Sequence, residues 1–327
     1  MKLTSLLKFA AVVLCAAAGM AYAQTVVLYS SNNTETIETA LNVVRKKSPS
    51  LTVQQVTGGT GSLMKRIQAE AENPRGDVFW SGGFGTLGAY RDYLQPYKSP
   101  DLAAISAEFR QPNDLWVGTN VHVMVIMVNE RQLKGMPAPK TWSDLMKPEW
   151  KGKFTITDPS KSATAYMLVY GLLKQFGREG LEKMAANAVI TSSSGSTYRG
   201  VAAGEYPVGL TIEFAAQEYV AGGQKEIKLV YPTEGSYLAP EGMFIVKGAK
   251  NLEAAKTLYN GLLSKEAQQE LLVKNFRRPT RTDIPVAKLT TLPELKAIRI
   301  FPISQENASA EYEQLLALWN LAVGKAR

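Results

Sequence analysis

The feature that most constrains the fold of this chain is a pattern that recurs four times. Each time, a short apolar run typical of a β-strand ends in a loop rich in serine, threonine, asparagine or glycine, and a run with helical periodicity follows. The four loops are residues 30–34, 57–62, 157–164 and 192–197. Strands that alternate with helices in this way predict an α/β fold with mixed, mostly parallel sheets and flanking helices.

These loops would place hydroxyl groups and free backbone N–H groups at the starts of helices. The first turn of a helix has N–H groups without partners and carries a partial positive charge, so it can hold a small anion. One such loop would only cap its own helix, whereas four indicate a cleft on which several helix starts converge. The candidate ligand-binding residues in these loops are Ser31, Asn32, Thr60, Gly61, Ser62, Ser160, Ser162, Thr164, Ser196 and Thr197.

Residues 1–23 have the pattern of an export signal peptide. Lys2 and Lys8 supply positive charge, residues 9–20 are apolar but too short to span a bilayer, and Ala21-Tyr22-Ala23 is a small-x-small cleavage site. The only cysteine, Cys15, lies inside this segment, so the chain from residue 24 onward has no disulfide and no thiol ligand. We therefore expect a soluble protein of the periplasm.

The length of the chain favours two domains, but no linker rich in proline, glycine and serine separates two halves. This indicates that the chain crosses between two lobes more than once. We predict one lobe from residues 24–118 plus 239–285 and a second from residues 119–238 plus 286–327. Ligands of open α/β sheets bind beyond the carboxyl ends of the strands, so the four loops would line a cleft between the lobes.

The order of several short motifs resembles that of the periplasmic substrate-binding proteins of ATP-binding-cassette (ABC) importers. The motifs are Val-Val-Leu-Tyr-Ser-Ser at 26–31, Thr-Gly-Gly-Thr-Gly-Ser at 57–62, Gly-Asp-Val-Phe-Trp at 76–80, Thr-Trp-Ser-Asp-Leu at 141–145, Pro-Glu-Trp-Lys-Gly-Lys at 148–153, and the stretch 254–268. The resemblance is strongest to the ferric-ion-binding-like group, which includes binders of phosphorylated sugars and aminoalkylphosphonates. It implies a type 2 periplasmic-binding fold whose lobes close on a ligand in the inter-lobe cleft and deliver it to a permease and ATPase complex in the inner membrane.

The branch of this family is set by the residues that would bind the ligand. Ferric binders of the family carry two adjacent tyrosines where this chain reads Glu213-Phe214-Ala215-Ala216, and its tyrosines nearby are separated. Phenyl and methyl groups do not bind iron, and the lone His122 lies in an apolar strand typical of a packed or hinge residue. We therefore expect no metal and no cofactor, and a small anion such as 2-aminoethylphosphonate or a sugar phosphate. Ferric ion held by separated tyrosines such as Tyr198, Tyr206 and Tyr219 is the alternative.

Two further features could recognise the rest of such a ligand. Glu213 follows a buried strand, and its carboxylate could accept from an ammonium or a pair of hydroxyls, or else form an ion pair within the protein. Aromatic residues could form a wall along the apolar part of the ligand, or else belong to the core. The candidates for this wall are Trp80, Tyr198 and Tyr237.

The sequence gives weaker support to the hypotheses that the protein is an enzyme or binds nucleic acid. Ser62-Leu63-Met64-Lys65 matches the Ser-x-x-Lys of periplasmic acyl hydrolases, but the companion motifs are absent. The glycine-rich run 83–88 matches a dinucleotide fingerprint, which an exported protein has little use for. The net charge of +8 is spread along the chain, and the densest cluster, Arg277, Arg278 and Arg281, is typical of a solvated face. We expect a monomer that binds no nucleic acid and is not an enzyme.

Overall fold

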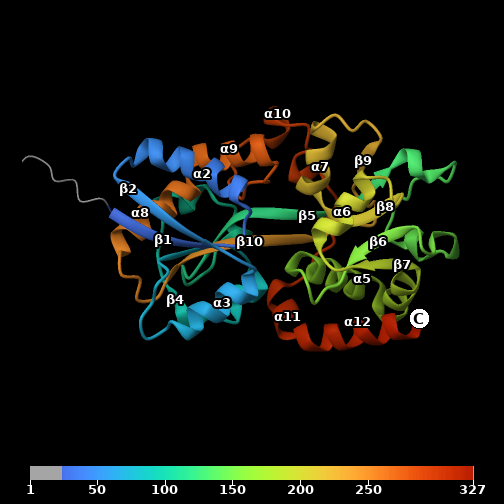
Figure 1. Ribbon diagram of the computed structural model, residues 1–327, viewed down its shortest axis with the longest axis horizontal. Coiled ribbons are helices and arrows are strands. Elements are labelled where there is room, and N and C mark those ends of the chain that lie inside the picture. The colour runs from blue at the N-terminus through green and yellow to red at the C-terminus, as the bar shows by residue number, and fades with distance from the viewer. Residues whose placement is uncertain (1–23, 327) are drawn as a thin grey trace, which may run out of the picture.

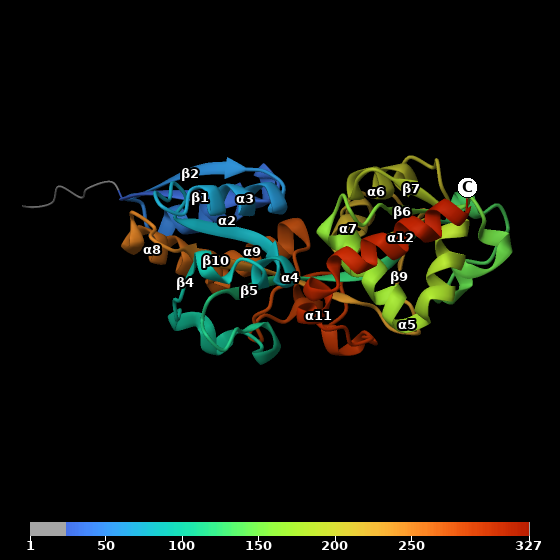
Figure 2. The ribbon, with the colours of Figure 1, turned by 90° about the horizontal axis from the view of Figure 1, so that it is seen from below.

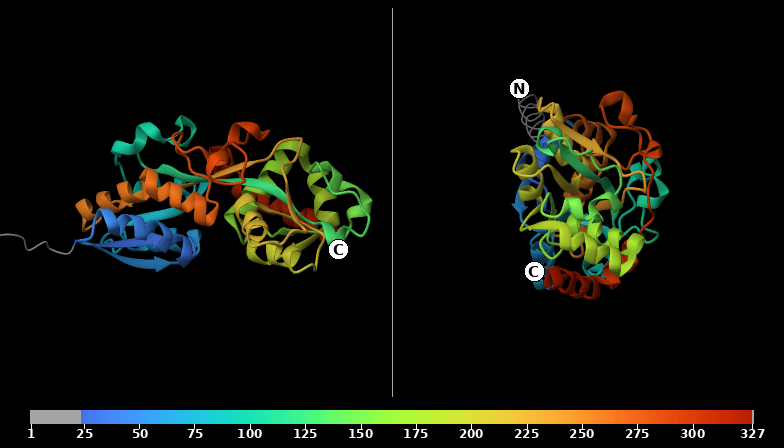
Figure 3. Two further views of the ribbon diagram at one scale, coloured as in Figure 1. Left: turned by 90° about the horizontal axis from the view of Figure 1, so that it is seen from above. Right: turned by 90° about the vertical axis from the view of Figure 1, so that its right-hand side faces the viewer.

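The computed structural model describes residues 24–326, which form two lobes joined at their centre (Figure 1). The predicted signal peptide, residues 1–23, lies outside the described residues. The two lobes lie end to end along the longest axis of the molecule, and a narrow waist connects them (Figures 2 and 3).

The lobe that contains the described N-terminal end has a sheet flanked by helices. Its strands are β1 (Gln24–Ser30), β2 (Leu51–Thr57), β3 (Val78–Gly83) and the short β4 (Leu94–Gln95). Its helices are α2 (Thr34–Lys47), α3 (Thr60–Ala69), α4 (Phe84–Gly88), α8 (Leu252–Leu263) and α9 (Lys265–Asn275). Strand β1 pairs in parallel with β2 and β3. We refer to this part as lobe 1.

The opposite lobe, lobe 2, repeats this plan with different segments. Its strands are β6 (Phe154–Thr157), β7 (Ala188–Thr191), β8 (Val208–Ile212) and β9 (Ile227–Val230). Its helices are α5 (Ala163–Asn187), α6 (Ser194–Ala202), α7 (Glu213–Ala221) and α12 (Tyr312–Ala326). Strand β6 pairs in parallel with β7 and β8. Two short helices, α10 (Val286–Leu289) and α11 (Gln305–Ala310), lie in the last part of the chain.

Short 3₁₀ turns connect these elements. They cover Arg91–Tyr93, Pro100–Ala104, Ala107–Phe109, Glu130–Leu133, Ser143–Met146, Pro148–Trp150 and Leu295–Ala297. The turn Ser143–Met146 does not extend into an α-helix, and Trp142 just before it is fully buried. Since Pro148 follows closely and favours extended backbone before it, the turn does not continue.

Two long strands connect the lobes, namely β5 (Val117–Asn129) and β10 (Leu238–Val246). The first half of β5 pairs antiparallel with β10, and its second half, from Met124 on, pairs antiparallel with β8. Between Asn120 and Met124, β10 is the only named strand beside β5, so the waist is built on a two-stranded ribbon, which the segment after α9 joins through a bridge between Asn120 and Pro279. Such a ribbon can bend more easily than a broad sheet, which makes it the natural hinge.

The pairing directions fix which ends of the strands face the waist. Strands β1, β2 and β3 run in the same direction as β5, that is, from lobe 1 toward lobe 2. Strands β6, β7 and β8 run against β5, so they point back toward lobe 1. The carboxyl ends of both sets of strands therefore approach the waist from opposite sides, as the arrows in Figure 1 show.

Each lobe has its own apolar core. One large cluster joins residues from β1, β2, β3, α2 and α8, and a second joins residues from β6, β8, α5 and α12. Every residue of β5 is buried, in agreement with its nearly continuous apolar sequence. The predicted lobe boundaries at 118/119 and 238/239 fall on the crossing strands, and the assignment of each segment to a lobe stays a prediction. Within residues 24–326, none of the helices has the length and apolar character needed to cross a membrane.

Candidate functional site

In lobe 1, the loops after β1, β2 and β3 meet through their hydroxyl groups. Ser31 donates through Oγ to the carbonyl of Ser81, and Thr60 donates through Oγ1 to Ser31 Oγ at 2.9 Å. Ser31 lies in the loop between β1 and α2, Thr60 is the first residue of α3, and Ser81 lies in the last part of β3. We call Ser31, Asn32, Thr60 and Ser81 the lobe 1 cluster. It brings together three of the residues predicted from sequence.

The backbone and side chains around this cluster show strain and unpaired polar groups. Ser81 has φ of +81°, a left-handed conformation that is unfavourable for a residue with a side chain. Asn32 is buried, and its Nδ2 has no hydrogen-bond partner among the described residues. Helix α3 starts after Gly59, which offers no side-chain cap, so the first N–H groups of α3 have no side-chain acceptor at that position.

In lobe 2, the starts of α5 and α6 are tied to each other. Ser162 caps α5 by accepting from the N–H of Ala165 at 3.2 Å, and Ser194 donates through Oγ to Ser162 Oγ at 2.8 Å. A small pocket opens beside this pair. It is lined by Met124, Thr157, Thr164, Ala165, Leu168, Ser194, Leu210, Thr211 and Ile212. We call Ser162, Thr164 and Ser194 the lobe 2 cluster. Ser194 uses its hydroxyl hydrogen in the bond to Ser162, so the neutral donors that remain here are the hydroxyls of Ser162 and Thr164 and the backbone N–H groups at the two helix starts.

The other predicted residues of these loops lie in varied surroundings. Thr197 is fully buried and shares its hydroxyl with Thr157 at 2.8 Å and Thr191 at 2.6 Å, so it helps to hold α6 against β6 and β7. Ser196 donates its backbone N–H to the capping hydroxyl of Ser193 at 3.1 Å. The remaining three, Gly61, Ser62 and Ser160, are exposed.

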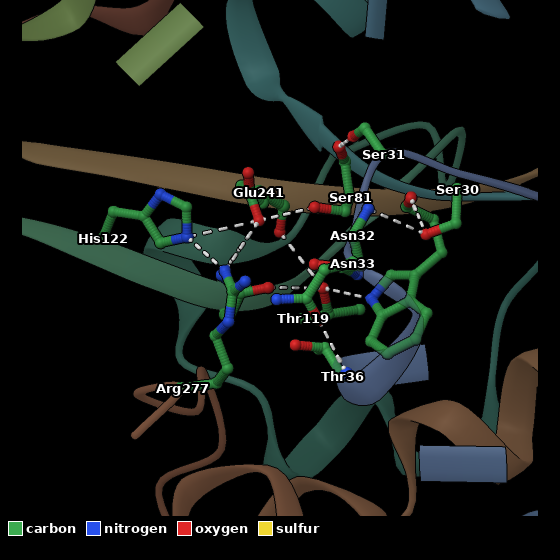
Figure 4. Close-up of polar contacts among 12 residues, drawn as sticks. Ser30, Ser31, Asn32, Asn33, Thr36, Ser81, Thr119, His122, Glu241 and Arg277 are labelled. Carbon is green, nitrogen blue, oxygen red and sulfur yellow. Dashed lines mark hydrogen bonds and ion pairs between the residues drawn. The ribbon is translucent and has the colours of Figure 1, made fainter. Parts of the chain in front are cut away.

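A group of polar side chains at the waist adjoins the lobe 1 cluster through Ser81 (Figure 4). Glu241 on β10 accepts from Ser81 Oγ at 2.7 Å and from Asn120 Nδ2 at 3.1 Å, and its Oε2 lies 3.3 Å from His122 Nε2. Burial acts to raise the pKa of this carboxyl, but contacts with His122 and Arg277 outweigh it and hold the pKa well below its ordinary value. Glu241 is therefore ionised in the folded protein, at the point where lobe 1 meets the hinge.

Arg277 completes this group from a segment that follows α9. Its Nη1 lies 3.0 Å from His122 Nε2, and its guanidinium lies 3.7 Å from the centroid of the Phe214 ring of α7. Burial lowers the pKa of Arg277, while Glu241 raises it. His122 packs on β5, which confirms the prediction of a packed or hinge residue. The buried atoms His122 Nδ1 and Arg277 Nε have no hydrogen-bond partner among the described residues.

Glu213, predicted to recognise a ligand, lies in a buried ion pair. Arg278 donates through Nη2 to Glu213 Oε1 at 2.7 Å and through Nε to Oε2 at 3.0 Å, and the Tyr231 hydroxyl donates to Oε1 at 2.7 Å. Glu213 is only 2% exposed, so in this structure neither of its oxygens is open to a ligand. Of its two possible roles, the structure shows the ion pair, and a role in ligand binding stays untested.

The arginine cluster was predicted to be a solvated face, and that prediction is wrong. Arg277, Arg278 and Arg281 are all buried. Arg281 donates to Asp101 at 2.8 Å and to Asp283 at 2.9 Å in lobe 1, while Arg278 reaches Glu213 on α7 of lobe 2. These three arginines, which are close in sequence, thus contact acceptors in lobe 1, at the hinge and in lobe 2. Their acceptors are distant in sequence, so the spacing of the arginines alone could not reveal them.

The residues of the predicted aromatic wall lie in different places. Trp80 is 1% exposed in the core of lobe 1 and donates through its indole N–H to Thr119 Oγ1 at 3.1 Å. Tyr237 is fully buried in lobe 2, where it stacks on Trp142 with ring centroids 5.4 Å apart. Tyr198 is half-buried, and its ring lies 6.2 Å from that of Tyr219.

Sequence reasoning missed several residues of this site. The roles of Glu241, Asn120, Ser81 and Ser194 were not predicted. The signal was a run of polar residues inside or at the end of otherwise apolar strands, which a buried strand tolerates only when they have partners. Within residues 24–326, no group of three His, Cys, Asp or Glu side chains is placed to hold a metal ion.

Comparison with known proteins identifies a family and several relatives that this chain resembles. A family described as bacterial extracellular solute-binding protein matches residues 74–302. The chain is 29% identical over 253 residues to a putative 2-aminoethylphosphonate-binding periplasmic protein of Salmonella typhimurium, which covers 73% of this chain and 72% of the relative. It is 26% identical over 290 residues to iron uptake protein A1 of Synechocystis, with coverage of 81% and 78%.

A solved structure shares the fold over almost its whole length. It is the periplasmic binding protein AfuA from Actinobacillus pleuropneumoniae with exogenous fructose-6-phosphate bound. The TM-score is 0.81 at 25% identity, covering 92% of this chain and 98% of that chain. This likeness confirms the predicted two-lobed periplasmic-binding-protein fold.

Proposed function

The chain belongs to the family of bacterial extracellular solute-binding proteins, and on this premise we propose that it captures a small organophosphorus anion. The ligand would be a phosphonate such as 2-aminoethylphosphonate, or a sugar phosphate. The predicted class, a periplasmic solute-binding protein, is confirmed by the family match and by the periplasmic relatives. The relatives are named for different ligands, namely a phosphonate, iron and a bound sugar phosphate. The choice among these ligands therefore depends on the residues of this chain.

The observation that carries the proposal is the pair of helix starts in lobe 2. Because Ser194 Oγ bonds to Ser162 Oγ, the starts of α5 and α6 lie side by side, next to a small pocket whose mostly apolar lining includes the hydroxyls of Thr164 and Ser194. Backbone N–H groups at helix starts and neutral hydroxyls are well suited to the oxygens of a phosphoryl group. The lobe 1 cluster approaches from the opposite side with the same chemistry, so that both lobes can contribute donors to one anion.

Binding by both clusters explains how a ligand would close the lobes. A ligand shifts the equilibrium between open and closed forms only if it makes contacts in the closed form that the open form lacks. An anion held by lobe 2 gains the donors of lobe 1 when the two-stranded ribbon of β5 and β10 bends. We propose that the closed form then docks on the permease of an ABC transporter as a monomer and releases its ligand there.

Ferric ion is the alternative cargo, and the chain offers it few ligands. The place of the adjacent tyrosines is taken by Glu213 and Phe214, and the Glu213 carboxylate is already occupied by Arg278. Tyr198 and Tyr219 lie near each other, and burial raises the pKa of Tyr219, which opposes the phenolate form that iron needs. Donors that are neutral and carry hydrogen suit an oxyanion better than a cation.

Catalysis by the Ser-x-x-Lys motif is not part of the proposed function. Ser62 and Lys65 are both exposed on α3, and no hydrogen bond joins them among the described contacts of this helix. A serine nucleophile needs a base within hydrogen-bond reach. Ser62 is better explained as a donor at the start of α3.

The proposal is tested by isothermal titration calorimetry with three phosphorus ligands and ferric citrate. The ligands are inorganic phosphate, 2-aminoethylphosphonate and glucose 6-phosphate, titrated into the wild type, Ser194→Ala and Ser162→Ala. Ser162→Ala removes a hydroxyl donor of the lobe 2 cluster, and Ser194→Ala removes the hydrogen bond that holds the two helix starts together. We expect affinity for the phosphorus ligand to fall about fivefold to tenfold in each variant.

A matched control separates helix capping from ligand binding. Ser264 caps α9 through the N–H of Ala267 at 3.3 Å, as Ser162 caps α5, but it lies away from the pocket. Ser264→Ala and Ser162→Ala should both lower the melting temperature, while only Ser162→Ala should weaken binding. Binding of ferric citrate by the wild type with no response to any phosphorus ligand would contradict the proposal.

A further inference from the structure

All the contacts that hold the Glu241 carboxylate converge on one of its two oxygens (Figure 4). Oε2 accepts hydrogen bonds from Ser81 at 2.7 Å and from Asn120 at 3.1 Å. The same oxygen is 3.3 Å from His122 Nε2 and 3.9 Å from Arg277 Nη1. Four groups from β3, β5 and the segment after α9 therefore fix the direction of this side chain.

The other oxygen, Oε1, accepts no hydrogen bond from the described residues around it. The Glu241 side chain is 17% exposed, in contrast to the neighbouring His122 at 5%. A carboxylate oxygen has lone pairs for two donors, so an ionised, fixed and open Oε1 is an unused acceptor. Its place is beside Ser81, whose carbonyl accepts from Ser31, so it adjoins the lobe 1 cluster (Figure 4).

The charge around Glu241 decides which kind of donor suits this oxygen. The Arg277 guanidinium is always protonated, is buried and lies within ion-pair distance, so it already offsets the negative charge of Glu241. An ammonium group brought to Oε1 would meet the repulsion of Arg277 in a site of low dielectric. A hydroxyl would donate the same hydrogen bond without adding charge.

The position of Oε1 on the waist puts it within reach of a ligand held between the two clusters. On β5, Asn120 contacts Glu241, and Met124, four residues further along the strand, lines the small pocket beside the starts of α5 and α6. A hydroxyl next to the phosphoryl group of such a ligand can therefore donate to Oε1.

We propose that Glu241 Oε1 is the acceptor for a hydroxyl of the ligand, and that the ligand is a polyhydroxylated phosphate ester of the sugar phosphate class. This inference rests on the proposed function and narrows it from organophosphorus anions in general to one chemical class. Glu241 is then the residue that determines specificity, and the two helix-start clusters supply the affinity for the phosphoryl group.

The test compares three ligands on the wild type and on Glu241→Gln by isothermal titration calorimetry. We expect the wild type to bind glucose 6-phosphate at least tenfold more tightly than 2-aminoethylphosphonate or inorganic phosphate. Glu241→Gln can keep an oxygen toward Ser81 and Asn120 and present an amide N–H₂ toward the ligand. It should lose at least tenfold in affinity for glucose 6-phosphate and change less than twofold for inorganic phosphate.

The control is Glu234→Gln, a half-buried glutamate of lobe 2 that accepts from Ser143 and lies outside the site. It should bind all three ligands as the wild type does, and the melting temperature of each variant confirms that it is folded. The inference is overturned if 2-aminoethylphosphonate binds the wild type as tightly as glucose 6-phosphate. It is also overturned if Glu241→Gln weakens inorganic phosphate equally. Failure of all three ligands to bind the wild type would instead reject the proposed function.

Discussion

Two glutamates of this protein lie beside buried arginines, but they differ in how many of their carboxylate oxygens have hydrogen-bond partners. Glu213, at the start of α7, receives three hydrogen bonds on its two oxygens from Arg278 and Tyr231 and is 2% exposed. Glu241, in the waist, is held through one oxygen and keeps the other open. The difference teaches that a buried carboxylate can meet a ligand only when its protein partners leave one of its oxygens free, as they do at Glu241 and not at Glu213.

The largest effect that we expect from changing either glutamate is a loss of stability on replacing Glu213. Glu213→Ala leaves the Arg278 charge buried without its partner, so we expect the free energy of unfolding to fall by about 3–5 kcal/mol. Urea denaturation followed by circular dichroism measures this. Glu213→Leu combined with Arg278→Leu removes both charges and should recover much of the loss. A Glu213→Ala variant of wild-type stability that had lost ligand affinity would break the comparison.

A smaller effect is expected from pH at Glu241. Its pKa is depressed in the folded protein, so the ionised form contributes stability that is present above the ordinary glutamate pKa of about 4.3 and is lost as pH falls below it. The wild type should therefore exceed Glu241→Gln in stability by about 1–2 kcal/mol at pH 7. The gap should shrink steadily between about pH 5 and pH 3. The measurement is urea denaturation of both proteins at several pH values. If the ionised form of Glu241 contributed no stability, the difference in free energy of unfolding between them would stay constant with pH.

The smallest expected effect concerns the third hydrogen bond to Glu213. Tyr231→Phe removes the hydroxyl that donates to Glu213 Oε1 but leaves the Arg278 pair in place. We expect a loss of about 1 kcal/mol in the free energy of unfolding and no change in affinity for a phosphorus ligand. Thermal unfolding and calorimetry on the same sample measure both. A change in ligand affinity with unchanged stability would place Tyr231 in the ligand site.

Local patterns predicted the fold well because the signals that set it are local. The nearly continuous apolar run of β5, the strand–loop–helix repeats and the hydroxyl-rich helix starts are all readable within short windows, and the structure has elements at these places. The hydroxyls of Ser31, Thr60 and Ser162 lie in the two clusters because each follows the carboxyl end of a strand that points toward the waist.

The choice between the two glutamates could not be made from sequence because it depends on distant partners. Glu213 and Arg278 are 65 positions apart, and Ser81 and Glu241 are 160 apart. Only the folded structure shows which glutamate has both carboxylate oxygens hydrogen-bonded by its partners. The same holds for Trp80 and Tyr237, which fill the cores of the two lobes, since an aromatic near a predicted loop can turn inward or outward.

The central claim is that the starts of α5 and α6 hold a phosphoryl group whose ester reaches Glu241. The most direct test is a crystal structure of the protein grown with glucose 6-phosphate. The account predicts a phosphoryl oxygen within hydrogen-bond distance of the Ser162 hydroxyl and of the backbone N–H groups at the starts of α5 and α6, with a sugar hydroxyl donating to Glu241 Oε1. A phosphoryl group bound elsewhere, or a metal ion held by Tyr198 and Tyr219 in place of the sugar phosphate, would contradict it.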